Sequence, residues 1–190
     1  MKPSLQMAML PLATVDDAVL AQRAVAGDRL ALTEIFRRYV DSVHQFVARL
    51  RGMDSDAVPD IVQQTFIAAF AAIATFRGDT LRPWLFGVAL NKSRMYVRSE
   101  VRRKRTITAA AAEPPLANES ELSARQRLEQ VQHHIAALKP IHREPLVLID
   151  MEGLSGNQAA ALLGIPAGTL WRRVFEARQQ LRVRLAGGDL

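Results

Sequence analysis

The sequence predicts an all-α protein made of two small helical domains. Apolar residues recur at three- and four-residue steps in two long stretches, and no stretch shows the alternation of a half-buried strand. Between them, residues 106–122 are rich in small residues and include a proline pair, which is typical of a linker. We therefore predict a flexible tail at 1–14, helical domains at 15–105 and 123–186, and a flexible linker between them.

Local signals predict the first two helices of the first domain. Thr14 resembles an N-cap, acidic residues follow it, and Gly27 is well placed to end the helix. Asp28 then opens a longer helix with one wide apolar stripe, which Gly52 stops. This second helix has the clearest periodicity in the chain.

Two further helices complete the predicted first domain. After a polar turn at 54–60, the apolar periodicity resumes at Val62 and continues to Phe76. A break at 77–79 precedes a fourth helix, expected from about Pro83 to Arg103. Its end is dense in positive charge and would repel itself unless it were solvated or neutralised by a polyanion. The basic residues there are Arg98, Arg102, Arg103, Lys104 and Arg105.

The second domain starts with a helical stripe over 128–138 and a short helix around 146–149. Ser155 and Gln158 form a capping-box pattern, which predicts a helix from Gly156 to Leu163. Gly164 ends that helix, and Pro166 is compatible with the first turn of the next one.

A short helix, a glycine turn and a longer helix are the plan of a helix-turn-helix, whose second helix enters the major groove by its N-terminal residues. Trp171, Arg172 and Arg173 occupy that end, and arginine has paired donors for guanine edges or phosphates. The alternative is an ordinary helical hairpin whose arginines form a solvated face.

The composition favours binding of a polyanionic partner over a catalytic role. The 25 lysines and arginines exceed the 19 acidic residues and give a formal charge of +6. There is no cysteine, and the four histidines lack the spacing of a metal site. We expect no metal, cofactor or catalytic residue, since no nucleophile–base pair or phosphate loop can be assembled. The longest uncharged run that could suggest a membrane, 61–76, is shorter than the roughly 20 residues of a spanning helix.

Three segments in order, 20–50, 56–105 and 138–182, resemble the extracytoplasmic-function group of bacterial sigma factors, the small ones that keep only regions two and four. The resemblance implies a cytoplasmic, non-catalytic promoter-specificity subunit. Such a subunit binds core RNA polymerase through the clamp helices of the largest subunit, recognises the minus-35 and minus-10 promoter elements, and acts on no small-molecule substrate. It also implies control by an anti-sigma factor, commonly membrane-anchored, which would hold the protein at the inner membrane face.

The same resemblance implies three sets of binding residues. Those for the minus-35 element are Thr169, Trp171, Arg172, Arg173, Phe175 and Arg178. Those for the minus-10 element are Arg77, Asp79, Asn91, Arg98, Arg102 and Arg103. Those for core polymerase are Asp60, Ile61, Gln63, Gln64 and Phe66.

Three features depart from the family pattern. Residues 56–60 have an extra residue and a proline before the polymerase-binding segment. Glu176 stands in the recognition helix where a basic residue is common. Pro145 lies early in a helix that usually has none, which we expect to shorten the helix or shift its start.

Two other functions compete with the sigma-factor prediction. One is a helix-turn-helix repressor that binds its operator without polymerase. The other is a helical partner-binding protein with no specific role at DNA. Promoter binding that depends on polymerase would exclude the repressor. Promoter-directed transcription would exclude the partner-binding protein.

Overall fold

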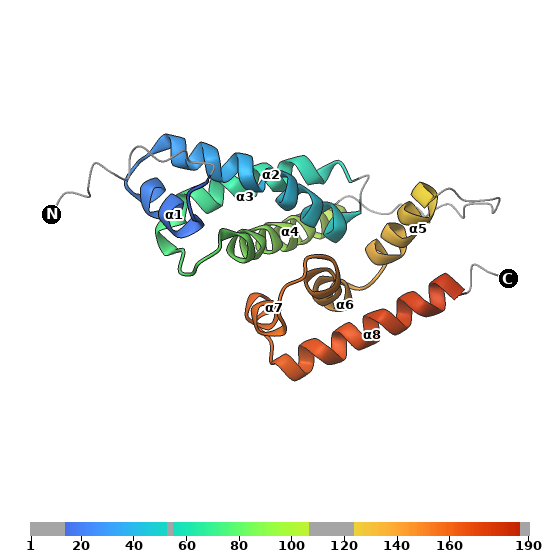
Figure 1. The fold of residues 1–190 in the computed structure, drawn as a ribbon. Coiled ribbons are helices and arrows are strands. Elements are labelled where there is room, and N and C mark those ends of the chain that lie inside the picture. The colour runs from blue at the N-terminus through green and yellow to red at the C-terminus, as the bar shows by residue number, and fades with distance from the viewer. Residues whose placement is uncertain (1–13, 53–54, 107–123, 187–190) are drawn as a thin grey trace.

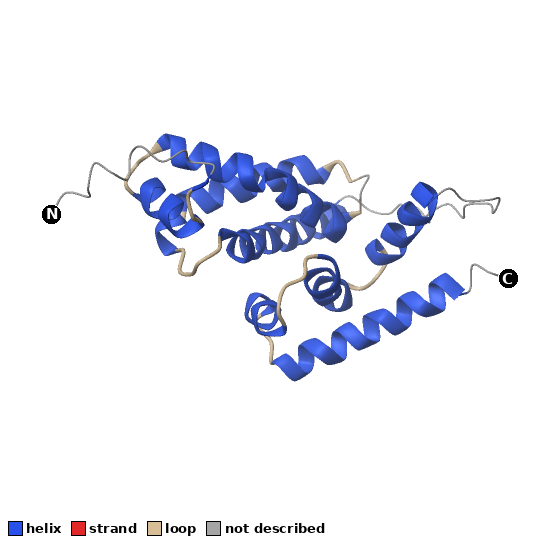
Figure 2. Ribbon diagram, in the orientation of Figure 1, coloured by secondary structure: helices blue, strands red, loops and turns tan. Residues whose placement is uncertain are grey.

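The computed structural model describes residues 14–52, 55–106 and 124–186. Regular structure in these ranges is helical throughout, without any strand (Figure 2). The helices form a first unit up to residue 106 and a second unit from residue 124, which packs against one side of the first (Figure 1). The predicted all-α class with two helical domains is confirmed. Apart from Thr14 and Thr106, the predicted tail and linker lie outside the described residues.

The first unit is a bundle whose longest helices begin and end at identifiable signals. Its elements are α1 (Asp17–Val25), α2 (Arg29–Arg51), α3 (Ala57–Ala71), the 3-10 turn η3 (Ile73–Thr75) and α4 (Leu81–Thr106). The Asp28 carboxylate accepts hydrogen bonds from the backbone N–H groups of Leu30 and Ala31 at 2.9 and 3.4 Å, which caps α2. Gly52 ends α2 with a φ of 99°. Both predicted ends of this helix are confirmed.

The starts of α1 and α4 differ from the prediction, and one side chain connects them. Asp16, not Thr14, is the N-cap of α1. The next residue, Asp17, is buried and accepts hydrogen bonds from Arg38 at 2.8 Å, from the Tyr39 hydroxyl, and from the Leu81 backbone N–H at 2.7 Å. Burial and the bond to Asp17 raise the pKa of Tyr39 above its usual value. α4 starts at Leu81, two residues before the expected start near Pro83, because the Asp17 carboxylate accepts the Leu81 N–H in its first turn.

The predicted limits of the third helix were also wrong. α3 starts at Ala57, inside the expected polar turn. Pro59 falls in its first turn, where backbone N–H groups have no partner within the helix, so the proline costs no hydrogen bond there. The helix ends at Ala71, and the apolar run continues as the 3-10 turn η3 rather than as α-helix.

The second unit contains α5 (Ala124–Ala136), α6 (Pro140–Leu146), a π turn η4 (Val147–Met151), α7 (Gly156–Leu163) and α8 (Ala167–Ala186). Ser155 and Gln158 form both bonds of the predicted capping box, and Gly164 ends α7 in the left-handed conformation. Pro145 does not stop the chain from staying helical to Met151, because a π turn follows in which the Glu152 N–H donates to the Val147 carbonyl at 2.9 Å. α6 itself ends at Leu146, one residue after Pro145, so the expected shortening applies to the α-helix but not to the helical segment as a whole.

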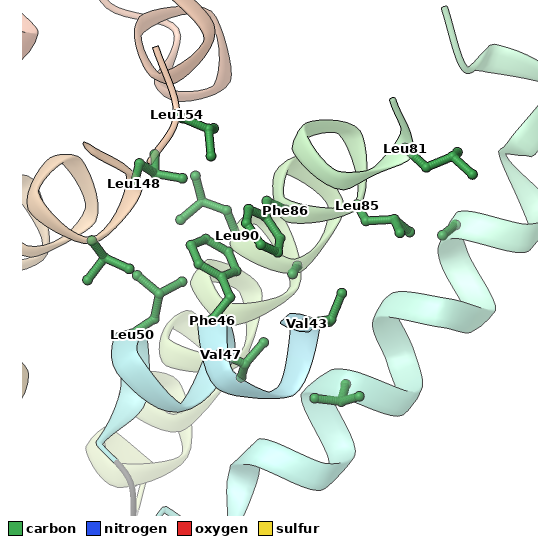
Figure 3. Close-up of a cluster of buried hydrophobic side chains, with 14 of the residues drawn as sticks. Val43, Phe46, Val47, Leu50, Leu81, Leu85, Phe86, Leu90, Leu148 and Leu154 are labelled. Atoms are coloured by element: carbon green, nitrogen blue, oxygen red, sulfur yellow. The ribbon is translucent and has the colours of Figure 1, made fainter. Parts of the chain in front are cut away.

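Side chains of both units share one apolar core. Phe46 and Phe86 of the first unit stack with ring centroids 4.4 Å apart, and Leu148 and Leu154 of the second unit lie beside them (Figure 3). In Figure 1, α6 and α7 lie between the first unit and α8. This arrangement leaves the outer face of α8 uncovered. Among the described helices, none has the length and apolar character needed to cross a membrane.

Candidate nucleic-acid and polymerase interfaces

The recognition helix α8 buries one face and exposes large side chains on the other. Leu170, Val174 and Ala177 are buried, which leaves the opposite side of the helix open. Trp171 is 49% exposed and Phe175 is 62% exposed, although both are aromatic. Exposed aromatic rings beside arginine are typical of a binding surface rather than of a solvated face.

The Trp171 ring of α8 packs against the start of α7. Its ring lies so close to Gly156, in the first turn of α7, that a Cβ there would be 2.9 Å from the ring. The glycine therefore makes room for the ring at the start of the helix-turn-helix. Thr169 and Arg173 are partly buried near the same helix end.

Two acidic residues contact the predicted minus-35 arginines. Glu176 lies 3.9 Å from Arg172 on the same helix and 3.5 Å from the imidazole of His142 on α6. Arg178 donates to both oxygens of Asp150 at 2.9 and 2.6 Å, which raises the pKa of its guanidinium. Arg172 is thus exposed on the outer face, whereas Arg178 is bound to the turn that follows α6. The spacing of four residues between Arg172 and Glu176 is readable from the sequence, whereas the pair of Asp150 and Arg178, 28 residues apart, is not.

Some of the predicted polymerase-binding residues are exposed on the surface of α3, and the others are buried beneath them. Asp60, Gln63 and Gln64 are exposed on α3, while Ile61 and Phe66 are 2% and 3% exposed and face the bundle. A groove of about 680 Å³ runs between α3 and α4, with Asp60, Ile61 and Gln64 on one wall. The opposite wall is formed by α4 residues, among them Lys92, Met95, Tyr96, Arg98 and Val101.

Sequence reasoning missed two exposed apolar side chains beside this surface. Ile67 of α3 is 55% exposed, and Phe36 of α2 is 43% exposed with its ring edge-on to Phe66 at 4.8 Å. Phe36 belongs to the apolar stripe of α2, and its position in that periodicity predicts burial. Only the packing of α2 against α3 shows that part of its ring remains in solvent.

The predicted minus-10 residues lie along the loop before α4 and on α4 itself. Arg77 and Asp79 are exposed, and the Arg77 guanidinium donates to the carbonyls of Ala74 and Phe76, both at 2.7 Å. Asn91 is exposed on α4. Arg98, Arg102 and Arg103 are also exposed, and Arg103 is 3.1 Å from Glu100. Trp84 packs partly buried against the core, with its ring edge-on to Phe76.

The contact between the two units contains a group of charges that sequence reasoning missed. Glu152 is 4% exposed, and its carboxylate accepts from Arg49 of α2 and from Arg82 of α4, the latter at 2.9 Å. Glu144 accepts from Arg94 of α4 at 3.1 and 2.6 Å, and this bond raises the pKa of Arg94. No short-range pattern pairs residues 50 to 103 positions apart.

Comparison with known proteins agrees with this architecture. Residues 35–103 match the family model "Sigma-70 region 2", and residues 128–181 match "Sigma-70, region 4". The ECF RNA polymerase sigma-E factor of Escherichia coli K12 is 31% identical over 177 residues, covering 87% of this chain and 92% of that protein. The sigma factor NccH of Alcaligenes xylosoxydans is 35% identical over 189 residues, covering 93% and 98%.

Two solved structures are similar over most of the chain. CnrH, in complex with the cytosolic domain of CnrY, has a TM-score of 0.66 and 29% identity, covering 90% of this chain and 97% of that one. The sigma factor RpoE of Bartonella quintana, in complex with the anti-sigma factor NepR, has a TM-score of 0.64 and 27% identity, covering 81% and 96%. These matches do not favour the repressor or the partner-binding alternative. The chain belongs to the extracytoplasmic-function group of the sigma-70 family and is a promoter-specificity subunit of RNA polymerase.

Proposed function

We propose that the two units divide the contacts of promoter recognition, with residues 15–105 binding core polymerase and the minus-10 element and residues 123–186 binding the minus-35 element. The exposed face of α8 carries this proposal. Two aromatic rings and Arg172 lie uncovered there, on the helix that a helix-turn-helix places in the major groove. Residues 106–122 join the two functions.

In the minus-35 contact, Arg172 is the base-reading residue and Trp171 and Phe175 supply apolar contacts. Arg172 has paired donors for a guanine edge. Thr169 and Arg173 lie near the N-terminal end of α8, where the helix dipole also favours a phosphate. Arg178 joins the contact if DNA phosphate replaces Asp150 as its partner.

In the minus-10 contact, Asn91 supplies hydrogen bonds to a base that leaves the stack, since capture of a base must offset a few kcal/mol of lost stacking. Arg77 and Asp79 flank it from the preceding loop. Further along α4, Arg98, Arg102 and Arg103 bind the DNA backbone. If the protein neutralises about 6 phosphates, its affinity for promoter DNA as holoenzyme falls roughly a thousandfold between about 50 and 200 mM salt.

In the polymerase contact, Asp60, Gln63 and Gln64 bind the clamp helices of the largest subunit, and the groove between α3 and α4 lies beside them. Ile61 and Phe66 contribute indirectly to this contact, because both are buried and hold α3 in place. The protein performs no reaction of its own and needs no cofactor or metal.

An anti-sigma factor is the proposed regulator. Of the two similar structures, one is CnrH in complex with the cytosolic domain of CnrY, and the other is the sigma factor RpoE in complex with the anti-sigma factor NepR. A partner of this kind, anchored in the membrane, would hold the protein on the cytoplasmic side of the inner membrane. Exposed apolar residues such as Phe36, Ile67 and Met95 give it a surface to cover.

The decisive experiment is transcription in vitro with core polymerase and fragmented genomic DNA, followed by mapping of start sites. Starts that share minus-35 and minus-10 sequences support the proposal. Specific DNA binding without polymerase would indicate a repressor, and co-purification with polymerase without directed transcription would indicate an interaction protein.

Arg172→Ala tests the base-reading role in the same assay. It should weaken use of the preferred minus-35 sequence by about 1–3 kcal/mol if Arg172 contacts a base edge. An equal loss on every minus-35 sequence would make Arg172 a phosphate contact. Val183→Ala, also on the exposed side of α8 but distant from its N-terminal end, is the matched control.

A further inference from the structure

Glu176 is the only acidic residue in the sequence of α8, the helix whose arginines are proposed to bind the minus-35 element. It follows Arg172 by four residues, so it lies about 6 Å further along the helix axis and about 40° around it. The Glu176 side chain is 40% exposed, compared with 68% for Arg172. Glu176 therefore lies at the edge of the exposed face of α8, close enough to share a DNA contact with Arg172.

The Glu176 carboxylate has two charged or polar neighbours but is hydrogen-bonded to neither. Its Oε1 lies 3.9 Å from Arg172 Nη1, and its Oε2 lies 3.5 Å from Nδ1 of His142 on α6, which lies beside α8 (Figure 1). Hydrogen bonds between nitrogen and oxygen are usually about 2.7–3.2 Å long. The buried Nδ1 of His142 accordingly has no hydrogen-bond partner. Both carboxylate oxygens can therefore accept a hydrogen bond from another donor.

The pair of Arg178 and Asp150 shows how a closed ion pair looks in the same region. Arg178 donates to both oxygens of Asp150, at 2.9 and 2.6 Å. The longer contact of Arg172 with Glu176 leaves the donors of the arginine and the acceptors of the glutamate free. An exposed pair of this spacing also contributes little to stability, so DNA can separate the two side chains at small cost.

A carboxylate in the major groove is favourable only beside a base that donates a hydrogen bond. DNA phosphates repel it, guanine presents only acceptors there, and thymine presents an acceptor and a methyl group. The donors are the N4 amino group of cytosine and the N6 amino group of adenine. Because adenine also presents the N7 acceptor beside its amino group, a carboxylate pairs best with cytosine.

We propose that Glu176 reads a cytosine of the minus-35 element, by accepting a hydrogen bond from its N4 amino group, within about two base pairs of the base that Arg172 contacts. The distance follows from the rise of about 6 Å between the two residues, since successive base pairs are about 3.4 Å apart. This inference rests on the proposed minus-35 role of α8. Arg172 selects a base that accepts and Glu176 selects a base that donates, so the two residues specify different bases.

Glutamine at position 176 distinguishes base reading from ion pairing within the helix. Its amide both donates and accepts, which matches the N6 and N7 groups of adenine. The test uses promoters that are randomised over the minus-35 element and transcribed by the holoenzyme. Wild type should prefer cytosine at one position by at least about tenfold, which corresponds to about 1.4 kcal/mol. Glu176→Gln should shift that preference to adenine, Glu176→Ala should remove it, and the other positions should keep their preferred bases.

Asp41→Asn is the matched control, because it makes the same change from carboxylate to amide at an exposed position of α2 and should leave every preference unchanged. An unchanged preference in Glu176→Gln, in a holoenzyme where Arg172→Ala still relaxes one position, would overturn Glu176 as a reader and leave the proposed function in place. Absence of any shared minus-35 sequence among the wild-type start sites would overturn the proposed function and this inference with it.

A modified base measures the contact itself. N4-methylcytosine still pairs with guanine, but its methyl group replaces the amino hydrogen that faces the major groove. At the selected position it should lower transcription by the wild type about tenfold relative to cytosine and should leave transcription by Glu176→Ala unchanged. An equal response of the two proteins would mean that the carboxylate does not contact the amino group, and the proposal would be wrong.

Discussion

Two buried carboxylates, Asp17 and Glu152, each connect parts of the chain that are distant in sequence, but they have different partners. Asp17 binds a backbone N–H, a tyrosine hydroxyl and Arg38, all within the first unit. The Glu152 carboxylate of the second unit binds only arginine side chains, and both arginines belong to the first unit. Arg49 and Arg82 keep 24% and 43% of their side-chain surface exposed, so they can return to water without disturbing the fold of the first unit. Asp17 therefore stabilises the fold of the first unit, whereas Glu152 stabilises the contact between the two units.

The largest expected effect follows from Asp17→Ala. The substitution leaves the Leu81 N–H and the Tyr39 hydroxyl without their partner and Arg38 without its carboxylate, so the first unit should lose about 3–5 kcal/mol of unfolding free energy. Urea denaturation followed by circular dichroism measures it. Asp16→Ala is the control, because the neighbouring Asp16 is exposed and its side chain makes no cap hydrogen bond. A loss below about 1 kcal/mol for Asp17→Ala would mean that the Asp17 hydrogen bonds are not essential for the fold of the first unit.

Glu152→Ala should weaken the contact between the two units without destabilising either unit by itself. The contact between the two units should weaken by about 2 kcal/mol, less than for a fully buried pair because both arginines are partly solvated. Urea unfolding should then show each unit melting separately, while the unfolding free energy of the first unit stays within about 0.5 kcal/mol of wild type. If that unit loses as much as it does in Asp17→Ala, the two carboxylates have the same role.

Gly87→Ala should produce the smallest effect. Its methyl group must displace the end of the Leu162 side chain, a flexible neighbour, so the contact should weaken by about 1 kcal/mol or less. Alanine also favours helix more than glycine does, so α4 itself should be slightly stabilised. Adding Leu162→Ala makes room for the methyl group. If the two residues do not touch in solution, the separate effects of Gly87→Ala and Leu162→Ala on scattering and on the free energy of unfolding should simply add in the double variant.

Locally encoded features of the fold could be predicted from the sequence. The cap at Asp28, the capping box at Ser155 and the left-handed Gly164 all depend on neighbours within a few residues, and each was predicted correctly. The start of α4 could not be predicted, because Asp17 provides its first hydrogen-bond partner from 64 residues away. The interface charges of Glu144 and Glu152 were missed for the same reason.

The candidate site shows the same division. The apolar spacing of Leu170 and Val174 is enough to orient α8 and to leave Arg172 on its exposed side. Spacing could not indicate that Asp150 binds Arg178, 28 residues away. Exposure of a helix position depends on which neighbour packs against it, and that is a property of tertiary structure.

The π turn that follows Pro145 determines the direction, around the helix axis, in which the residues after it point. A π turn accommodates one more residue than an α turn, and one residue corresponds to about 100° of rotation about the helix axis. A chain with an ordinary α turn there would present the residue after Met151 on a different side of the second unit, away from Arg49 and Arg82. The extra rotation that this wide turn introduces thus determines which side of the second unit faces the first.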